Sequence, residues 1–148
     1  MFYLKSPLLR HFLKISAFLG LFFLIILDRF LKYRLYTSGG FYVCNPGISF
    51  GITLSNFVFW LLLVFFIIIF AYWIFFFYNK KAYTSLFIVF FVVLGALSNI
   101  FDRLIFGCVM DYLFIFGEFF PIFNFADVVI CVSITIFVCF LIKNKRFC

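Results

Sequence analysis

Long apolar segments that are almost free of charge constrain the fold of this chain more than any other feature. Two of them, residues 57–78 and 82–101, contain no charged residue at all. A helix that spans the hydrocarbon core of a membrane needs about 20 mostly apolar residues. Apolar residues make up 68% of the chain and charged residues 11%, and the mean hydropathy is +1.29. This composition excludes a soluble globular domain and indicates a multi-span membrane protein.

The apolar segments predict an all-α membrane protein, a four-transmembrane-helix bundle that forms a single domain over residues 1–148. The four spans are expected at residues 12–31, 57–78, 82–101 and 125–142. The first is expected to be a retained helix, because it runs into Asp28 and Arg29 without the small-residue pattern of a signal-peptide cleavage site. Between the first two spans, residues 36–56 are rich in glycine and contain a proline. They predict a small, β-rich extracytoplasmic lobe.

Basic residues gather on one side of this expected bundle. All five acidic residues fall on the other side, together with four of the twelve basic residues. The other eight basic residues are Lys5, Arg10, Lys14, Lys80, Lys81, Lys143, Lys145 and Arg146. Because positive charge is retained on the cytoplasmic side, we expect both termini in the cytoplasm and residues 36–56 and 108–124 outside. The net charge of +7 is then a topology signal, and no nucleic-acid partner is expected.

Two carboxylates at the outer face are the strongest functional signal. Asp111 and Asp127 close a short apolar segment in a chain with few acids. Carboxylates at the edge of hydrocarbon are costly, so they mark a functional site by default. Two carboxylates that come together can share a proton, which is the basis of hydrolysis by an aspartyl dyad. From the spacing alone, two solvated aspartates at helix ends remain an equal alternative.

Other polar residues occur at helical spacing near the same face. Asp28 and Lys32 are four residues apart, in the order that favours a helix ion pair, and they are expected to act as a strut at the outer end of the first span. Gly95, Asn99, Asp102 and Arg103 fall on one face of the third helix. There Gly95 would let a neighbouring helix come close, and Arg103 could bind a carbonyl or carboxylate.

Asn124 precedes Asp127 by three residues. Asparagine is a good N-cap and an acid at the third helical position is favoured by the helix dipole, which alone would explain both residues. Asn45 and Gly47 lie in the lobe, where the backbone could approach an extended peptide, although an ordinary turn explains them as well.

The five cysteines show no metal-binding spacing. Cys131 and Cys139 suit apolar positions in the fourth span, and Cys44 and Cys108 fall on the outer side, within reach of an oxidant. No role is assigned to them.

Taken in order, these motifs resemble the bacterial lipoprotein signal peptidases, the signal peptidase II family. The first are Asp28-x-x-x-Lys32 and Asn45-Pro46-Gly47 followed by Phe50-Gly51. The third helix contributes Gly95-x-x-x-Asn99-x-x-Asp102-Arg103. The last are Gly107-x-Val109-x-Asp111-Tyr112 and Phe120-Pro121-x-Phe123-Asn124-x-Ala126-Asp127. The order, the four-span pattern and the chain length all agree with that family.

The resemblance implies a membrane aspartyl endopeptidase of the bacterial inner membrane, with its active site at the outer face. Its substrates would be diacylglyceryl-modified prolipoproteins, cut on the amino side of the lipidated cysteine, and globomycin-type inhibitors and membrane lipid would also bind. No metal or organic cofactor is implied. Asp111 and Asp127 match the catalytic pair. Substrate-binding positions match Asn45, Gly47, Asn99, Arg103 and Asn124. Structural support positions match Asp28, Lys32, Gly95 and Asp102.

The chain departs from the family pattern in three places. Ile48 and Ser49 stand where the family commonly has alanines, Ser98 stands where it often has glycine, and the outer segment 114–119 is short.

The alternative function is a small ion- or proton-coupled transport subunit, which would predict acids near the membrane midplane and internal repeats. A non-catalytic assembly subunit is a second alternative, in which the polar residues would only hold helices together. The acids instead cluster at one face, and no repeat is evident.

Overall fold

The computed structural model describes residues 7–47, 55–115 and 121–143 of the chain. These ranges form four helices and two short strands. Their bounds are Pro7–Ser38 for α1, Val43–Asn45 for β1, Asn56–Asn79 for α2, Tyr83–Phe106 for α3, Val109–Asp111 for β2 and Phe125–Lys143 for α4. The protein is therefore mostly helical with one small sheet, as the sequence predicts in outline.

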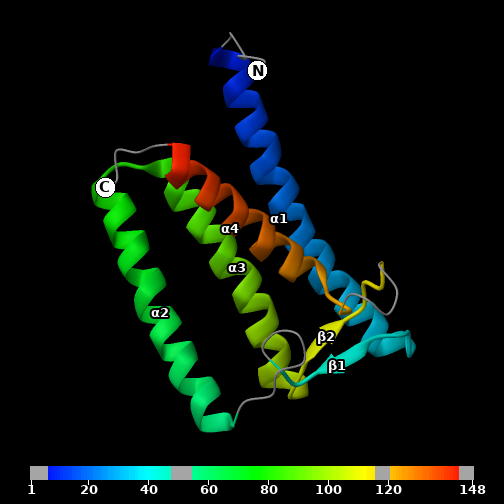
Figure 1. The fold of residues 1–148 in the computed structure, drawn as a ribbon. Helices are drawn as coiled ribbons and strands as arrows, with labels where there is room; N and C mark the ends of the chain where they lie inside the picture. The colour runs from blue at the N-terminus through cyan, green and yellow to red at the C-terminus, as the bar shows by residue number, and fades with distance from the viewer. Residues whose placement is uncertain (1–6, 48–54, 116–120, 144–148) are drawn as a thin grey trace.

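Three of the helices could cross a membrane. Among the described residues, α2, α3 and the segment Phe125–Ile142 of α4 are long and apolar enough by length and composition. The membrane character of the chain is thereby confirmed, while a fourth span in α1 stays a prediction. α1 begins and α4 ends at the same end of the bundle, and the two strands lie at the opposite end (Figure 1).

α3 is the central helix. It packs against α1, α2 and α4, and α2 stands on the side of α3 away from α1 (Figure 1). The approach of α3 to α4 depends on Gly95. A Cβ atom at that position would lie 2.7 Å from Cγ1 of Ile130 and 2.9 Å from the carbonyl oxygen of Ala126. The absence of a side chain at Gly95 therefore lets the two helices come together, which is the close approach predicted from the sequence.

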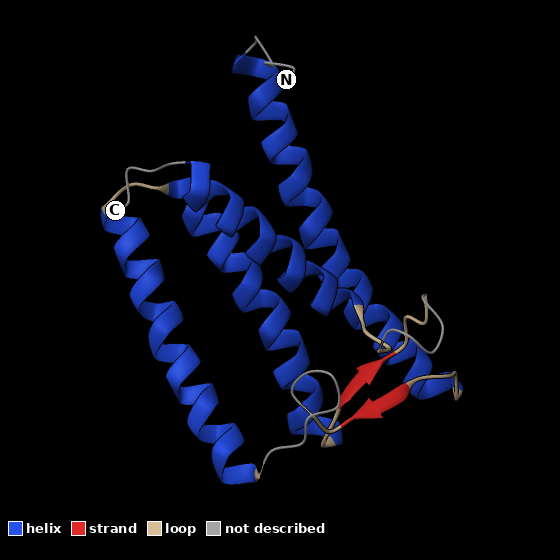
Figure 2. Ribbon diagram, viewed as in Figure 1, coloured by secondary structure: helices blue, strands red, loops and turns tan. Residues whose placement is uncertain are grey.

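The two strands form an antiparallel sheet in which Val43 is opposite Asp111 and Asn45 is opposite Val109. α3 leads directly into this sheet, because it ends at Gly107, whose φ of 75° is left-handed. Residues that carry a side chain rarely adopt that backbone conformation, so glycine permits the sharp turn from the helix into β2. The sheet lies across one end of the bundle, close to the end of α1 and the start of α4 (Figure 2).

The predicted outer lobe, residues 36–56, requires a correction. α1 continues to Ser38, because its last turns have no glycine or proline before Gly39. The strand that follows finds its partner outside the lobe, in β2, so the sheet joins two distant loops. Such a short strand cannot stand alone and takes whichever edge the tertiary fold offers. Residues 48–54 lie outside the described part of the chain.

Candidate active site

Asp111 and Asp127 line the same cavity, of about 590 Å³. Asp111 is the last residue of β2 and is only 3% exposed, and Asp127 lies in the first turn of α4. The cavity wall is formed by parts of α2, α3, α4 and both strands, and by residues 121–123. The fold therefore brings together the two carboxylates that sequence reasoning paired, although they lie on different elements.

Asn124 connects the two carboxylates. Its backbone N–H donates to Oδ2 of Asp127 at 3.1 Å, and its Oδ1 accepts a hydrogen bond from the backbone N–H of Asp127 at 3.0 Å. This reciprocal arrangement is a capping box at the start of α4 and confirms the predicted N-cap. The Nδ2 atom of the same side chain donates to Oδ1 of Asp111 at 2.7 Å. One fully buried residue thus fixes both carboxylates, Asp111 through its side-chain amide and Asp127 through its backbone N–H.

Two other amides each orient one carboxylate from a distant part of the chain. Asn45, at the end of β1, donates its Nδ2 to Oδ2 of Asp111 at 2.9 Å. Asn99, in α3, donates its Nδ2 to Oδ1 of Asp127 at 2.7 Å. Hydrogen bonds to an ionised oxygen are stronger than neutral ones. Each carboxylate is therefore held from two directions while still lining the cavity.

Burial raises the pKa of Asp111 from its ordinary value of 3.8 to about 6. The hydrogen bond from Asn45 opposes this shift, the charge of Asp127 adds to it, and Asn124 and Lys32 lower the pKa. Two carboxylates that interact this way titrate as a pair. The raised pKa keeps Asp111 protonated up to mildly acidic pH.

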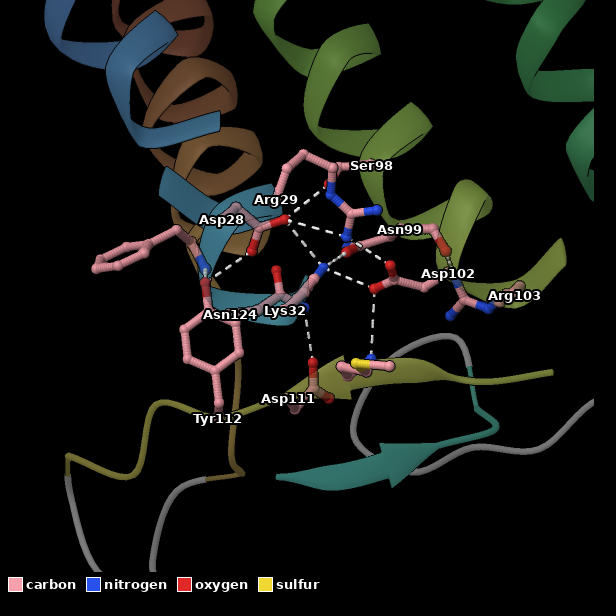
Figure 3. Close-up of polar contacts among 12 residues, drawn as sticks. Asp28, Arg29, Lys32, Ser98, Asn99, Asp102, Arg103, Asp111, Tyr112 and Asn124 are labelled. Carbon is pink, nitrogen blue, oxygen red and sulfur yellow. Dashed lines mark hydrogen bonds and ion pairs between the residues drawn. The ribbon is translucent and has the colours of Figure 1, made fainter. Parts of the chain in front are cut away.

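A buried ion cluster contacts Asn99 (Figure 3). Nζ of Lys32 is 3.0 Å from Oδ2 of Asp28 and 2.8 Å from Oδ2 of Asp102, and all three residues are at most 2% exposed. The predicted pair of Asp28 and Lys32 is confirmed. Nζ of Lys32 also donates to Oδ1 of Asn99 at 3.1 Å, and the other end of that amide binds Asp127. The cluster consequently supports one carboxylate of the cavity through a single side chain.

Sequence reasoning missed three members of this cluster. Arg29 binds Asp102, and Asp28 accepts hydrogen bonds from the hydroxyls of Ser98 at 2.7 Å and Tyr112 at 2.8 Å. Burial, followed by the charge of Asp28, raises the pKa of Tyr112, so it acts as a donor. The departure at Ser98 was the available signal, because a buried hydroxyl needs a hydrogen-bond partner.

Arg103 faces the cavity from α3. One terminal nitrogen donates to the carbonyl oxygen of Gly47 at 2.6 Å and the other to the carbonyl oxygen of Asn99 at 3.5 Å. Its guanidinium also lies over the ring of Phe59, 5.4 Å from the ring centroid. Within the described ranges, its buried Nε atom has no hydrogen-bond partner. The carbonyl contact predicted for Arg103 is therefore present.

All the site residues predicted from the sequence lie in the described part of the chain, towards the end of the bundle that carries the sheet. The cavity is lined by Asn45, Asn99, Arg103, Asp111 and Asp127. Gly47 and Asn124 are buried, and they bind the lining residues Arg103 and Asp111, respectively. The departures at Ile48 and Ser49 fall outside the described residues, as do residues 116–119 of the short outer segment. Ser98 is bonded to Asp28 and is not part of the cavity wall that the structure describes.

A disulfide joins Cys44 to Cys108, with a Cα–Cα distance of 5.4 Å. Sequence reasoning assigned no partner to either cysteine, and the reason is that their 64-residue separation is closed only by the pairing of β1 with β2. Two cysteines that were expected on the same side of the membrane, each next to a site motif, were the available signal. Cys131 and Cys139 are free thiols in α4.

Similarity to known proteins agrees with this geometry. The profile of the signal peptidase (SPase) II family matches residues 20–143. The lipoprotein signal peptidase of Blochmanniella pennsylvanica is 34% identical over 104 residues, which cover 65% of this chain and 62% of that protein. The lipoprotein signal peptidase of Helicobacter pylori is 32% identical over 143 residues, which cover 88% of this chain and 90% of that protein.

The fold is also similar to a bacterial membrane enzyme solved by the in meso method at 2.3 Å resolution. The TM-score is 0.67 at 25% sequence identity, covering 88% of this chain and 89% of the other. Fold and site together thus define a membrane peptidase with a pair of carboxylates at one end of a helical bundle. The chain belongs to the signal peptidase II family.

Proposed function

We propose that this protein is a membrane aspartyl endopeptidase that removes signal peptides from diacylglyceryl-modified prolipoproteins, cutting on the amino side of the lipidated cysteine. The observation that carries the proposal is the presence of Asp111 and Asp127 in one cavity, joined through Asn124. Membership of the signal peptidase II family supports the same reaction. A transport subunit, the alternative from the sequence, has no comparable support.

The chemistry follows from the two carboxylates. Asp111, whose pKa is raised to about 6, is the member that carries the proton, and Asp127, at the N-terminus of α4, is the ionised member because the helix dipole favours negative charge there. Asp127 takes a proton from water as the water oxygen bonds to the scissile carbonyl carbon. Asp111 gives its proton to the leaving nitrogen as the C–N bond breaks. Exchange of the proton between them restores the pair.

The guanidinium of Arg103 has a place in this reaction. It lines the same cavity as the two carboxylates, where a peptide carbonyl oxygen would gain negative charge as water adds. A positioned donor stabilises such an oxyanion. The Gly47 carbonyl that holds the guanidinium in place then contributes to substrate binding indirectly. Asn45, Asn99 and Asn124 position the acids, and the first two also line the substrate cavity.

The cavity wall suits a lipid-bearing substrate. Away from the carboxylates it is apolar, with Leu62 and Leu63 from α2 and Ile130 and Val132 from α4. α2 and α4 are also long and apolar enough to lie in the bilayer. A diacylglyceryl group could therefore stay among apolar side chains while the scissile bond reaches the acids. The same surfaces would take a globomycin-type inhibitor.

We place the site at the outer face of the bacterial inner membrane, with α1 as the fourth span and both termini in the cytoplasm. Eight basic residues and no acid on the inner side support this orientation. The common end at which α1 begins and α4 ends supports an even number of spans (Figure 1). The disulfide agrees with it, since disulfides persist on the oxidising side of a membrane.

Thiol labelling tests this orientation. One variant keeps only Cys44 and Cys108, and another keeps only Cys148. In intact spheroplasts, a membrane-impermeant maleimide should label the first variant only after an impermeant phosphine has reduced the disulfide, and should leave the second unlabelled until lysis. Labelling of Cys148 in intact spheroplasts would show the opposite orientation.

The pH dependence of cleavage should follow the pKa of Asp111. If protonated Asp111 is the acid in the free enzyme, kcat/KM should fall about tenfold per pH unit above an apparent pKa near 6. Asn45→Ala removes a hydrogen bond that favours the ionised form of Asp111. The pKa of Asp111 should therefore rise, and the high-pH limb of the kcat/KM profile should move to higher pH. A limb that stays in place or moves to lower pH would contradict this assignment.

The function itself is tested with purified protein in detergent and a synthetic prolipoprotein peptide that carries a diacylglyceryl group on its lipobox cysteine. Mass spectrometry should find one cut, on the amino side of that cysteine. The same peptide without the lipid is the matched control and should be cleaved far more slowly. No cleavage of the lipidated peptide by folded protein would overturn the proposal.

A further inference from the structure

The disulfide lies immediately beside the candidate site. Cys44 is the central residue of β1, where it pairs with Met110, and Cys108 lies between the end of α3 and β2. The bond therefore ties the segment after α1 to the segment after α3, across the sheet that carries Asp111. Within the described part of the chain, this is the one covalent link between those segments.

Contacts with the site begin at the next residue of β1. Asn45 donates to Asp111 at 2.9 Å, and its Oδ1 accepts a hydrogen bond from the backbone N–H of Gly47 at 2.9 Å. The carbonyl oxygen of Gly47 in turn accepts from Arg103 at 2.6 Å. Both sides of the cavity, the acid Asp111 and the cation Arg103, are therefore reached from the single short segment that the disulfide holds.

Little else holds β1 in place. The strand is three residues long, and the burial of Val43 and Cys44 is slight, since both are exposed. A two-stranded ladder is marginally stable by itself. Its register nevertheless decides whether Asn45 meets Asp111, because a shift by one residue turns every side chain to the other face of the sheet. A cross-link at Cys44 fixes that register next to the residue that depends on it.

We propose that the Cys44–Cys108 disulfide is a positioning element of the site: it holds Asn45 on Asp111 and the Gly47 carbonyl on Arg103, so that full activity requires the oxidised pair. This inference rests on the proposed function. The two cysteines touch no reacting atom and act through Asn45 and Gly47. The consequence is a peptidase whose activity depends on the redox state of the outer compartment.

The redox step is thiol–disulfide exchange. The two cysteine thiols give up two electrons and two protons to a protein or small-molecule disulfide, which leaves as two thiols. A dithiol such as dithiothreitol reverses the step and becomes a cyclic disulfide. The oxidant required is therefore a disulfide of the outer compartment.

The test compares oxidised protein, protein treated with dithiothreitol, and the variant Cys44→Ser/Cys108→Ser, with Cys139→Ser as a matched control in α4. For each, kcat and KM are measured with the lipidated peptide across pH. We expect reduction or the double substitution to lower kcat/KM at least tenfold and to move its basic limb to higher pH, as Asn45→Ala does. Cys139→Ser should keep the rate and the sensitivity to dithiothreitol, and the double variant should be insensitive to the reagent.

The pH readout separates positioning from general support. Asp111 is faced by Asp127 from α4, by Lys32 from α1 and by Arg103 from α3, and none of these is altered in the variants. The addition of Asn45→Ala to the double cysteine variant should then cause little further loss. An unchanged kcat/KM with an unchanged high-pH limb would overturn the proposal. Losses from the cysteine and Asn45 substitutions that multiply would also overturn it, and so would unfolding of the protein on reduction. Failure of oxidised wild-type protein to cleave would instead count against the proposed function.

Discussion

Asp111→Asn and Asp127→Asn should each abolish cleavage of the lipidated peptide, with a fall in kcat on the order of 10⁴-fold. The double variant should be no worse than either single one. The reason is that both carboxylates handle protons in one reaction, and residues that work as a unit have strongly non-additive effects. Single-turnover assays of the three variants at pH 5–7 measure this. Binding of the lipidated peptide or of globomycin should persist in part, because the rest of the cavity wall is unchanged.

Asp102→Asn is the comparison that makes this result specific. Asp102 is another acid near the site, in the same helix as Asn99. It is fully buried, and its oxygens contact Arg29 and Lys32. Its substitution should therefore lower stability, and the protein that remains folded should still cleave. Substantial cleavage by either Asp111→Asn or Asp127→Asn, or single losses that multiply in the double variant, would refute the two-carboxylate mechanism.

Lys32→Met should cause the largest loss of stability. Lys32 is 2% exposed and lies between Asp28 and Asp102, which are both fully buried. Its removal leaves two buried carboxylates short of a cation, and breaking such a buried pair costs about 3–5 kcal/mol. The unfolding midpoint in detergent should fall clearly. Activity should fall as well, because Asn99 loses a donor that orients it towards Asp127.

Arg34→Met is the matched control, since Arg34 is an exposed cation on the same helix. It should change neither the unfolding midpoint nor the rate. If Lys32→Met loses activity while its midpoint equals that of the Arg34 variant, the cluster is not a structural support. A direct contact of Lys32 with substrate would then be the better explanation.

Much of the fold is local and was accessible from the sequence. The uncharged stretches within α2 and α3 specify apolar helices whatever the rest of the chain does. The capping box of Asn124 and Asp127 and the pair of Asp28 and Lys32 lie within one helical turn each, so spacing predicts them. The site motifs were likewise readable, because family resemblance depends on the order of residues along the chain.

The contacts between distant segments were not accessible in this way. The donors to Asp28, the hydroxyls of Ser98 and Tyr112, come from 70 and 84 residues away. In the described part of the proposed outer lobe, β1 pairs with β2. No local pattern encodes which of several short strands will meet, because the hydrogen bonds of a three-residue strand are too few to select a partner without the surrounding packing.

The sequence by itself determined the membrane class and the apolar helices, and it predicted the pairing of Asp111 with Asp127, because apolar length, capping and motif order are properties of the chain alone. The tertiary structure decided how those acids are held. Asn45 meets Asp111, and Lys32 reaches Asp127 through Asn99, only when α1, α3 and the sheet converge. The disulfide between Cys44 and Cys108 depends on the same convergence. The physical reason is that these contacts form between groups whose proximity arises from packing, which spacing along the chain does not record.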